Sequence, residues 1–140
     1  MNDKRIDSAY WALRIAYGAV PVVAGLDKFT NLLVDWKTYL SPLFARLLPV
    51  SPAAFMHAVG VVEIAVGVLV LFAATRLGAW LAAAWLACIA VNILTSGHHL
   101  DVAVRDLVMA LGAYTLARLE ESRHAAAARS RPLEAARHAA

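Results

Sequence analysis

Four long apolar segments alternate with short polar stretches along the chain. They cover residues 10–29, 53–75, 77–96 and 102–119. A helix needs about 20 predominantly apolar residues to cross the hydrocarbon core of a bilayer, so each segment is long enough to span a membrane. The fourth segment is the least apolar, because Arg105 and Asp106 stand near its start. The pattern predicts an all-α integral membrane protein built as a four-helix bundle.

The stretches between the apolar segments predict how the helices connect. Only residues 75–78 separate the second and third segments, which predicts a tight antiparallel hairpin. Residues 31–52 carry apolar side chains at helical spacing with polar residues between them, and Pro42 interrupts the run. This pattern predicts one or two short amphipathic helices in the membrane interface. They would either rest on lipid as a connector or cover a cavity as a lid.

Composition supports the membrane assignment, and charge gives an orientation. Hydrophobic residues make up 61% of the 140 residues and charged residues 16%, whereas an ordinary soluble domain has about 45–50% and about 25%. Four spans place both termini on one side, which the positive-inside rule then assigns to the cytoplasm. That side carries eight basic residues against four on the other: Lys4, Arg5, Arg76, Arg118, Arg123, Arg129, Arg131 and Arg137 against Lys28, Lys37, Arg46 and Arg105.

The remaining polar residues exclude several classes of function. Residues 1–121 are expected to form the membrane domain and residues 122–140 a basic, alanine-rich cytoplasmic tail, which indicates a membrane surface rather than nucleic-acid binding. Cys88 is the only cysteine, so neither an intramolecular disulfide nor a thiol relay can form. His98 and His99 are adjacent, with no partner at ligand spacing, so we expect no metal site.

Charged residues inside the apolar segments mark the candidate site. A charge in a membrane span costs about 2.5–3.5 kcal/mol on insertion scales, so it tends to face the bundle interior and pair. Small residues on the same helix face would let a neighbouring helix approach. Helical spacing groups charged and small residues on common faces: Arg14, Gly18, Pro21, Gly25 and Lys28; Gly60, Glu63 and Gly67; and Asp106, Ala110, Ala113 and Ala117.

Depth along the helices, at about 1.5 Å per residue, predicts which polar groups meet. An outer cluster is predicted, with His57 near its mouth; its members are Lys28, Glu63, Asn92 and Asp106. Glu63 lies near mid-membrane and Arg14 in the inner half, from where Arg14 could reach Glu63. The arrangement predicts either a structural ion-pair network that fixes helix register or a polar pocket that opens to the outer face. The candidate ligand-binding residues are Arg14, Lys28, His57, Glu63, Asn92 and Asp106. Of these, Glu63 and Asp106 are the candidates for proton handling.

Three stretches carry glycine-rich motifs in a characteristic order. They are LRIAYGAVPVVAGLDKF, HAVGVVEIAVGVLVLF and, after a short TRLGA turn, RDLVMALGAYTLARL. The positions that matter are Arg14, Gly18, Gly25, Lys28, Gly60, Glu63, Gly67, Asp106 and Gly112. Together they resemble the DoxX family of four-helix bacterial membrane proteins, over about residues 9–119. The resemblance implies a multi-pass protein of the bacterial cytoplasmic (inner) membrane.

The resemblance also implies a class of function. Some family members resemble subunits of thiosulfate:quinone oxidoreductases or membrane anchors for soluble sulfur and redox-defence enzymes. A membrane subunit or anchor of a quinone- or sulfur-linked redox system, with a soluble redox enzyme as partner, is therefore implied. The sequence shows no motif for an intrinsic redox cofactor, so electron transfer would need a bound quinone or a partner's cofactor. The alternative is a non-enzymatic, transport-like module that holds a ligand or partner, so enzymatic activity and homo-oligomerisation stay open.

Overall fold

The computed structural model describes residues 3–138, with side chains from 4 to 129, and this part contains helices and no strand. In order the elements are α1 (Asp3–Thr30), the 3-10 helix η1 (Trp36–Tyr39), α2 (Pro42–Leu47), α3 (Pro52–Val68), the π-helical turn η2 (Leu69–Ala73), α4 (Thr75–Ser96) and α5 (Leu100–His138). Within these residues three segments, Lys4–Thr30, Pro52–Ala73 and Thr75–Ser96, are long and apolar enough to cross a membrane. With α5 packed along α4, they confirm the predicted all-α, four-helix membrane architecture.

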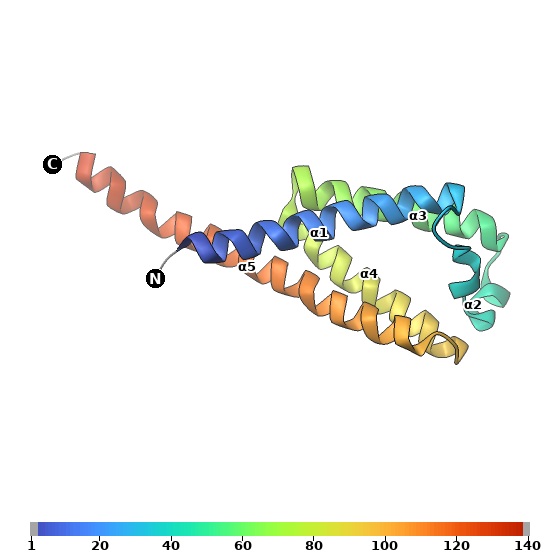
Figure 1. Ribbon diagram of the computed structural model, residues 1–140. Coiled ribbons are helices and arrows are strands. Elements are labelled where there is room, and N and C mark those ends of the chain that lie inside the picture. Colours follow the sequence, from blue (N-terminus) through green and yellow to red (C-terminus); the bar gives the residue numbers. More distant parts are fainter. Residues whose placement is uncertain (1–2, 139–140) are drawn as a thin grey trace.

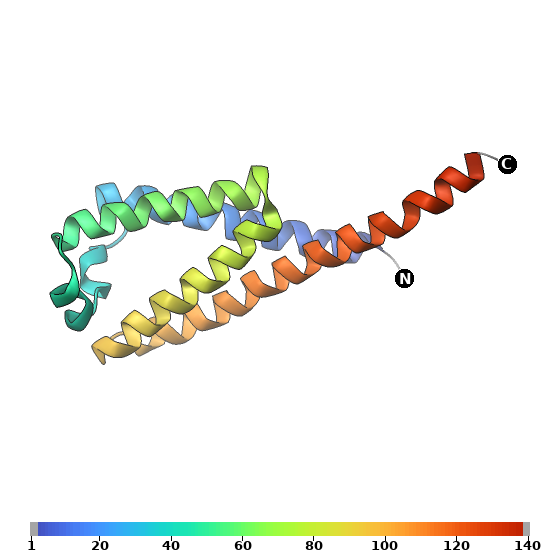
Figure 2. The same cartoon turned by 180° about the vertical axis from the view of Figure 1, so that it is seen from behind.

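The four long helices form two pairs that diverge from a common junction (Figure 1). α1 packs along α3 and α4 packs along α5, and most contacts between helices fall within these two pairs. The pairs meet at the turn from η2 to α4, and Figure 2 shows α3 and α4 diverging from that turn. α2 lies near the opposite end of α3, where the pairs are furthest apart. The segment between α1 and α3 therefore lies at this end, where it contacts α4 of the second pair.

Backbone contact between glycines explains why α3 packs against α1. A Cβ atom added to Gly60 would lie 2.6 Å from the carbonyl oxygen of Gly25, and one added to Gly25 would lie 2.6 Å from that of Gly60. Gly67 approaches the carbonyl of Gly18 in the same way. Stripes of small residues allow such close approach between membrane helices. The glycine faces predicted for the first and second spans are thus confirmed.

Alanines take the corresponding role between α4 and α5. Ala82 packs in one buried cluster with Ala113, and Ala79 packs in another with Ala117. The small face predicted for the fourth span is therefore buried as expected. Because α3 presents its small face to α1 while α4 presents its own to α5, the two helices diverge after Ala74. The prediction of a tight α3–α4 hairpin is wrong for this reason, although the connection is short: η2 continues α3, and the single residue Ala74 joins η2 to α4.

The segment between α1 and α3 contains the short helices that the sequence predicts. η1 and α2 begin after Asp35 and Ser41, whose side chains accept hydrogen bonds from backbone N–H groups of the first turn. Leu32, Leu33 and Leu47 are strongly exposed. Exposed apolar side chains on short helices suit the boundary between lipid and water.

The C-terminal helix is longer than the predicted fourth span. It begins after Gly97, whose φ of 72° ends α4 in a left-handed turn, and it runs without a break to His138. The tail predicted from residue 122 onward thus begins inside α5, and its last residues, 139 and 140, lie outside the described part. The division into a membrane domain and a tail stays a prediction.

Candidate functional site

A buried ion pair links the two helices of the first pair. Lys28, in the last turn of α1, places its Nζ 2.6 Å from Oε2 of Glu63, in the middle of α3. The two residues keep only 4% and 7% of their surface exposed. Burying two charges is costly unless they meet at close range with good geometry. The predicted meeting of Lys28 and Glu63 is therefore confirmed.

An aromatic ring covers the Lys28 ammonium group from another side. The Nζ atom of Lys28 lies 3.6 Å from the centroid of the Trp36 ring, which is within the range of a cation–π interaction. The indole N–H of Trp36 donates to Oδ2 of Asp27 at 2.7 Å. Lys28 is thus held between a carboxylate and an aromatic face, and the segment between α1 and α3 supplies that face.

Asp27 fastens this segment to the end of α1, and sequence reasoning missed it together with Trp36. Its carboxylate accepts hydrogen bonds from the backbone N–H groups of Leu32 and Leu33 and from the side chains of Thr30 and Trp36. A signal was present, because an acid in the last turn of a helix opposes the helix dipole and needs other partners. The residue before Lys28 therefore orders the covering segment.

Two side chains from the second helix pair approach the ion pair. Asp106 of α5 is buried, and its carboxyl group interacts electrostatically with Lys28 and with Glu63. Its nearest cation in α5 is Arg105, 3.6 Å away but 65% exposed. The indole N–H of Trp85 in α4 is buried and forms no hydrogen bond of normal geometry among the described residues, but it acts as a weak donor toward the Glu63 carboxylate. We call Lys28, Glu63, Trp85 and Asp106 the charge cluster.

The composition of the charge cluster defines what it can do chemically. The Glu63 carboxylate is paired with the buried ammonium group of Lys28, and the Asp106 carboxyl group interacts with that ammonium group only electrostatically. Neighbouring carboxyl groups in such a site can hold and release a proton, as proton-handling sites require. The indole N–H of Trp85 is a donor that a bound acceptor could satisfy. The cluster therefore combines two buried carboxyl groups with one indole donor that forms no hydrogen bond of normal geometry among the described residues.

Asn92, a predicted ligand-binding residue, braces the connecting segment against α4. Its amide N–H donates to the carbonyl of Tyr39 at 2.7 Å, and its amide oxygen accepts from the backbone N–H of Ser41 at 3.1 Å. Ser41 is fully buried, so the second bond satisfies a backbone group that has lost contact with water. These two bonds join the segment after α1 to the second helix pair.

His57 lies on the surface rather than in the charge cluster. It is exposed and stacks on Phe29 of α1, with ring centroids 4.9 Å apart. Cys88 is exposed as well. Among the residues described, no group of three or more His, Cys, Asp or Glu side chains is placed to hold a metal ion.

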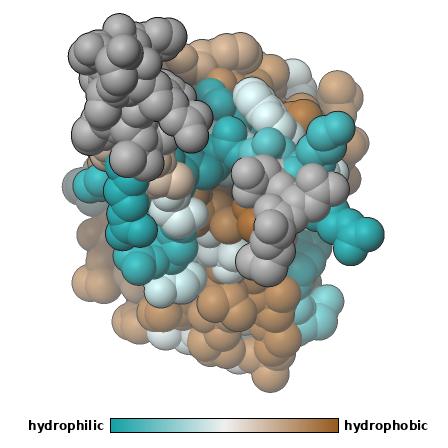
Figure 3. Space-filling model, turned by 90° about the vertical axis from the view of Figure 1, so that its left-hand side faces the viewer, coloured by the Kyte–Doolittle hydropathy of each residue, from teal (hydrophilic) through white to brown (hydrophobic). Residues whose placement is uncertain are grey.

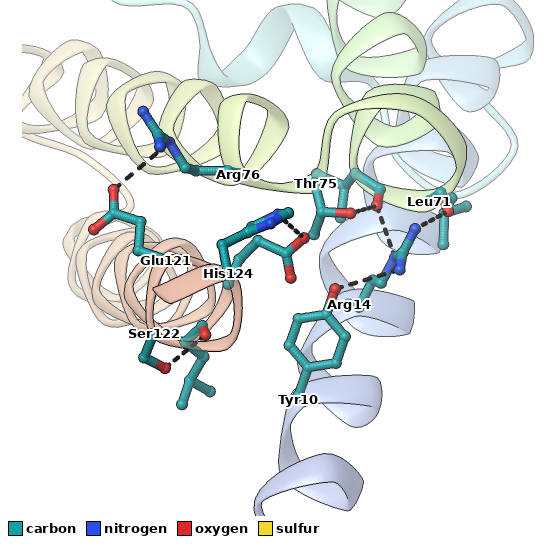
Figure 4. A network of polar contacts seen from close by, with 11 residues as sticks. Tyr10, Arg14, Leu71, Thr75, Arg76, Glu121, Ser122 and His124 are labelled. Atoms are coloured by element: carbon teal, nitrogen blue, oxygen red, sulfur yellow. Dashed lines mark hydrogen bonds and ion pairs between the residues drawn. The ribbon is translucent and has the colours of Figure 1, made fainter. Parts of the chain in front are cut away.

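Arg14 lies at the other end of the bundle, at the junction of the helix pairs. Its guanidinium group donates to the carbonyl oxygens of Val70 and Leu71 at 3.1 and 2.7 Å (Figure 4). Carbonyl groups in the last turn of a helix lack partners within that helix, and Arg14 satisfies two of them in η2. The predicted approach of Arg14 to Glu63 is therefore wrong. Depth alone suggested it, and the π-helical turn that attracts the arginine was not visible in the sequence.

Comparison with known proteins identifies the family. The family model described as DoxX matches residues 9–99, which extend from α1 through α4 and include Lys28, Glu63 and Trp85. The match stops before Asp106 and Gly112, so the resemblance expected for the fourth span lies outside it. No curated protein and no solved structure matches the chain. Because the matched region covers more than half of the 140 residues, this multi-pass membrane protein belongs to the DoxX family.

Proposed function

We propose that the protein is a membrane subunit that binds the head group of a quinone-type molecule at the charge cluster and exchanges protons with it. One observation supports the proposal: among the described residues the buried indole N–H of Trp85 forms no hydrogen bond of normal geometry, and the group with which it interacts weakly is the Glu63 carboxylate. A buried donor without a partner costs about 1–3 kcal/mol. A bound carbonyl oxygen, which every quinone head group carries, would remove that cost.

Each member of the charge cluster would then have its own role. Trp85 would donate a hydrogen bond to the carbonyl of the ligand. Asp106, whose only close ion-pair partner among the described residues is the exposed Arg105, would exchange protons. Lys28 is already occupied by Glu63 and Trp36, so it would position the Glu63 carboxylate rather than touch the ligand.

A redox partner would complete this function. Reduction of a quinone takes up two electrons and two protons, and the carboxyl groups of the cluster can supply only the protons. We propose that a soluble redox enzyme, docked at the membrane surface, exchanges the electrons. The protein would then be the quinone-binding and membrane-anchoring part of a larger system.

Binding of a short-chain ubiquinone analogue to the purified protein in detergent tests the proposal. Loss of one buried hydrogen bond in Trp85→Phe should weaken binding by about tenfold. Trp80→Phe is the matched control, because Trp80 lies on the same helix and its indole bonds to Glu121 at 3.2 Å, away from the cluster. No binding by the unaltered protein, or equal binding by the two variants, would contradict the proposal.

A non-enzymatic binding module is the second candidate, and the closure of the Lys28–Glu63 pair beneath Trp36 favours it. Proton uptake, followed with a pH-indicator dye while reduced methyl viologen, which gives up electrons without protons, reduces the bound analogue, separates the two candidates. In a proton-exchanging subunit, Asp106→Asn should slow proton uptake by about tenfold or more, without a matching loss of analogue binding. Unchanged proton uptake in Asp106→Asn would favour the binding module.

We also propose that both termini face the bacterial cytoplasm, with the charge cluster toward the outer half of the membrane. The support is the excess of basic residues at the end that carries the termini. A C-terminal fusion to a green fluorescent protein should be fluorescent, and a fusion to alkaline phosphatase should be inactive. The opposite pattern would reverse the orientation.

A further inference from the structure

A polar cavity, here called the junction cavity, opens where the two helix pairs meet, at the end opposite the connecting segment. Its volume is about 430 Å³. The lining comes from three helices: Arg14 of α1, residues 73–77 around the turn into α4, and Glu120 and His124 of α5. Figure 4 shows Arg14 and His124 on either side of Thr75. The proposed function leaves this cavity without a role.

Positive charge and hydrogen-bond donors predominate in the junction cavity. Arg14 uses three of its five N–H groups on protein oxygens, which leaves two for another acceptor. Arg76 is 65% exposed and only loosely paired, at 3.8 Å from Glu121. His124 lies 3.2 Å from Glu120, the one acid in the lining. Two arginines and a histidine against one acid favour an anionic ligand.

The start of α4 adds backbone donors to the same cavity. Ala74 precedes the helix and offers no side chain to cap it, and the hydroxyl of Thr75 donates instead to the carbonyl of Val70 at 3.0 Å. The first-turn N–H groups of α4 therefore receive no side-chain acceptor, and residues 75–77 line the cavity. Backbone donors at a helix start, when combined with arginines, suit a phosphate group.

The cavity also adjoins the turn between two membrane-spanning segments, where a bilayer is expected to place the phosphates of its lipids. The turn between Ala73 and Thr75 ends one membrane-spanning segment and begins the next. Figure 3 views this end of the molecule, where hydrophilic residues gather between hydrophobic flanks. The side chain of Leu77, which also lines the cavity, is exposed beside the basic groups. A lipid could place its phosphate on the arginines and its acyl chains along such an apolar surface.

We propose that the junction cavity binds the phosphate group of a phospholipid, which Arg76 and His124 contact at the rim and Arg14 contacts at the back. These three side chains come from α4, α5 and α1, so one bound lipid would bridge both helix pairs at the point from which they diverge. The site is separate from the charge cluster and does not depend on quinone binding.

Native mass spectrometry of the full-length protein in detergent, with dioleoylphosphatidylglycerol as the probe, tests the proposal. We expect one retained lipid, with occupancy reduced by about fivefold in Arg76→Gln and further in Arg76→Gln combined with His124→Gln. Arg118→Gln is the matched control. Arg118 lies at the same end, is 59% exposed and also pairs with Glu121, but it does not line the cavity. Its loss should change occupancy by less than about twofold.

Two further probes identify the source of the phosphate. Dioleoylglycerol, which has the same acyl chains without phosphate, should not be retained. Inorganic phosphate should not displace the phospholipid, because it lacks the acyl chains. Equal loss of lipid in Arg76→Gln and Arg118→Gln, or retention of dioleoylglycerol, would overturn the site. Binding of inorganic phosphate without retention of phospholipid would contradict the proposal of a phospholipid and would indicate a site for a free anion.

Discussion

The two helix pairs are stabilised in different ways. α1 and α3 meet backbone to backbone at Gly25 and Gly60 and share the buried Lys28–Glu63 ion pair. α4 and α5 pack through buried alanines, and the ion pair between them, Arg76 with Glu121, is exposed and loose at 3.8 Å. The stability of the first pair therefore depends on close backbone contacts and on one buried ion pair, where an added atom or a lost charge is costly. The stability of the second pair depends on the volume of its buried side chains. Substitutions at matched positions should separate these two kinds of stability.

Breaking the buried ion pair should have the largest effect. Lys28→Met leaves the Glu63 carboxylate buried without its partner, which should lower the free energy of unfolding by about 3–5 kcal/mol. Arg76→Met, which removes the exposed ion pair of the second helix pair, should cost less than about 1 kcal/mol. Unfolding in mixed detergent micelles, followed by far-UV circular dichroism, measures both values.

The double variant Lys28→Met with Glu63→Met shows whether the cost comes from the unpaired charge. Replacement of both partners by apolar side chains of similar size should restore most of the stability lost in Lys28→Met. If the double variant were as unstable as the single one, the ion pair itself would be indispensable for holding α1 against α3.

Adding one methyl group within the first pair should have the next largest effect, and a methyl group on α5 that meets α1, between the two pairs, gives the comparison. In Gly60→Ala the new Cβ meets the backbone carbonyl of Gly25, which cannot move without the whole helix, so we expect a loss of about 1–3 kcal/mol. In Gly112→Ala on α5 the new Cβ meets the hydroxyl end of Tyr17, which can swing aside at a smaller cost. The same unfolding measurement applies, and a larger loss in Gly112→Ala would contradict the comparison.

The sequence was informative about each helix and less informative about how the helices pair. The lengths of the apolar segments and the small faces around Gly60 and Ala113 were readable, because helical periodicity is a local property of the chain. The divergence of α3 from α4 was not readable, since periodicity marks a small face but does not say which helix will cover it. The positions of Asp27 and Arg14 depend on a loop and on a π-helical turn that form only after the helices pack.

Loss of the Asn92 brace should have a moderate effect on stability and a visible effect on shape. Asn92→Ala leaves the buried backbone N–H of Ser41 without its acceptor, which should cost about 1–2 kcal/mol. The distance distribution between spin labels on Leu43 of α2 and Leu94 of α4, in a protein lacking Cys88, should broaden, because the segment is no longer tied to α4.

Thr95→Ala is the control for the Asn92 brace. Thr95 is exposed on the same turn of α4, and its hydroxyl donates only to the nearby carbonyl of Asn92. Its removal should leave the distance distribution unchanged. Equal broadening in the two variants would show that the brace does not hold the segment in place.

The smallest effect should come from a hydrogen bond that joins the two pairs. The hydroxyl of Tyr17 on α1 donates to the carbonyl of Met109 on α5 at 2.7 Å. Tyr17→Phe should therefore cost about 1 kcal/mol, whereas Tyr114→Phe, at an exposed position on α5, should cost less than about 0.5 kcal/mol.

Tyr17→Phe combined with Gly112→Ala should cost less than the sum of the two single changes, because removal of the hydroxyl removes the overlap with the added methyl group. Additive costs would mean that a contact other than the one with Tyr17 requires glycine at position 112. The hydrogen bond between the pairs would then not explain that requirement.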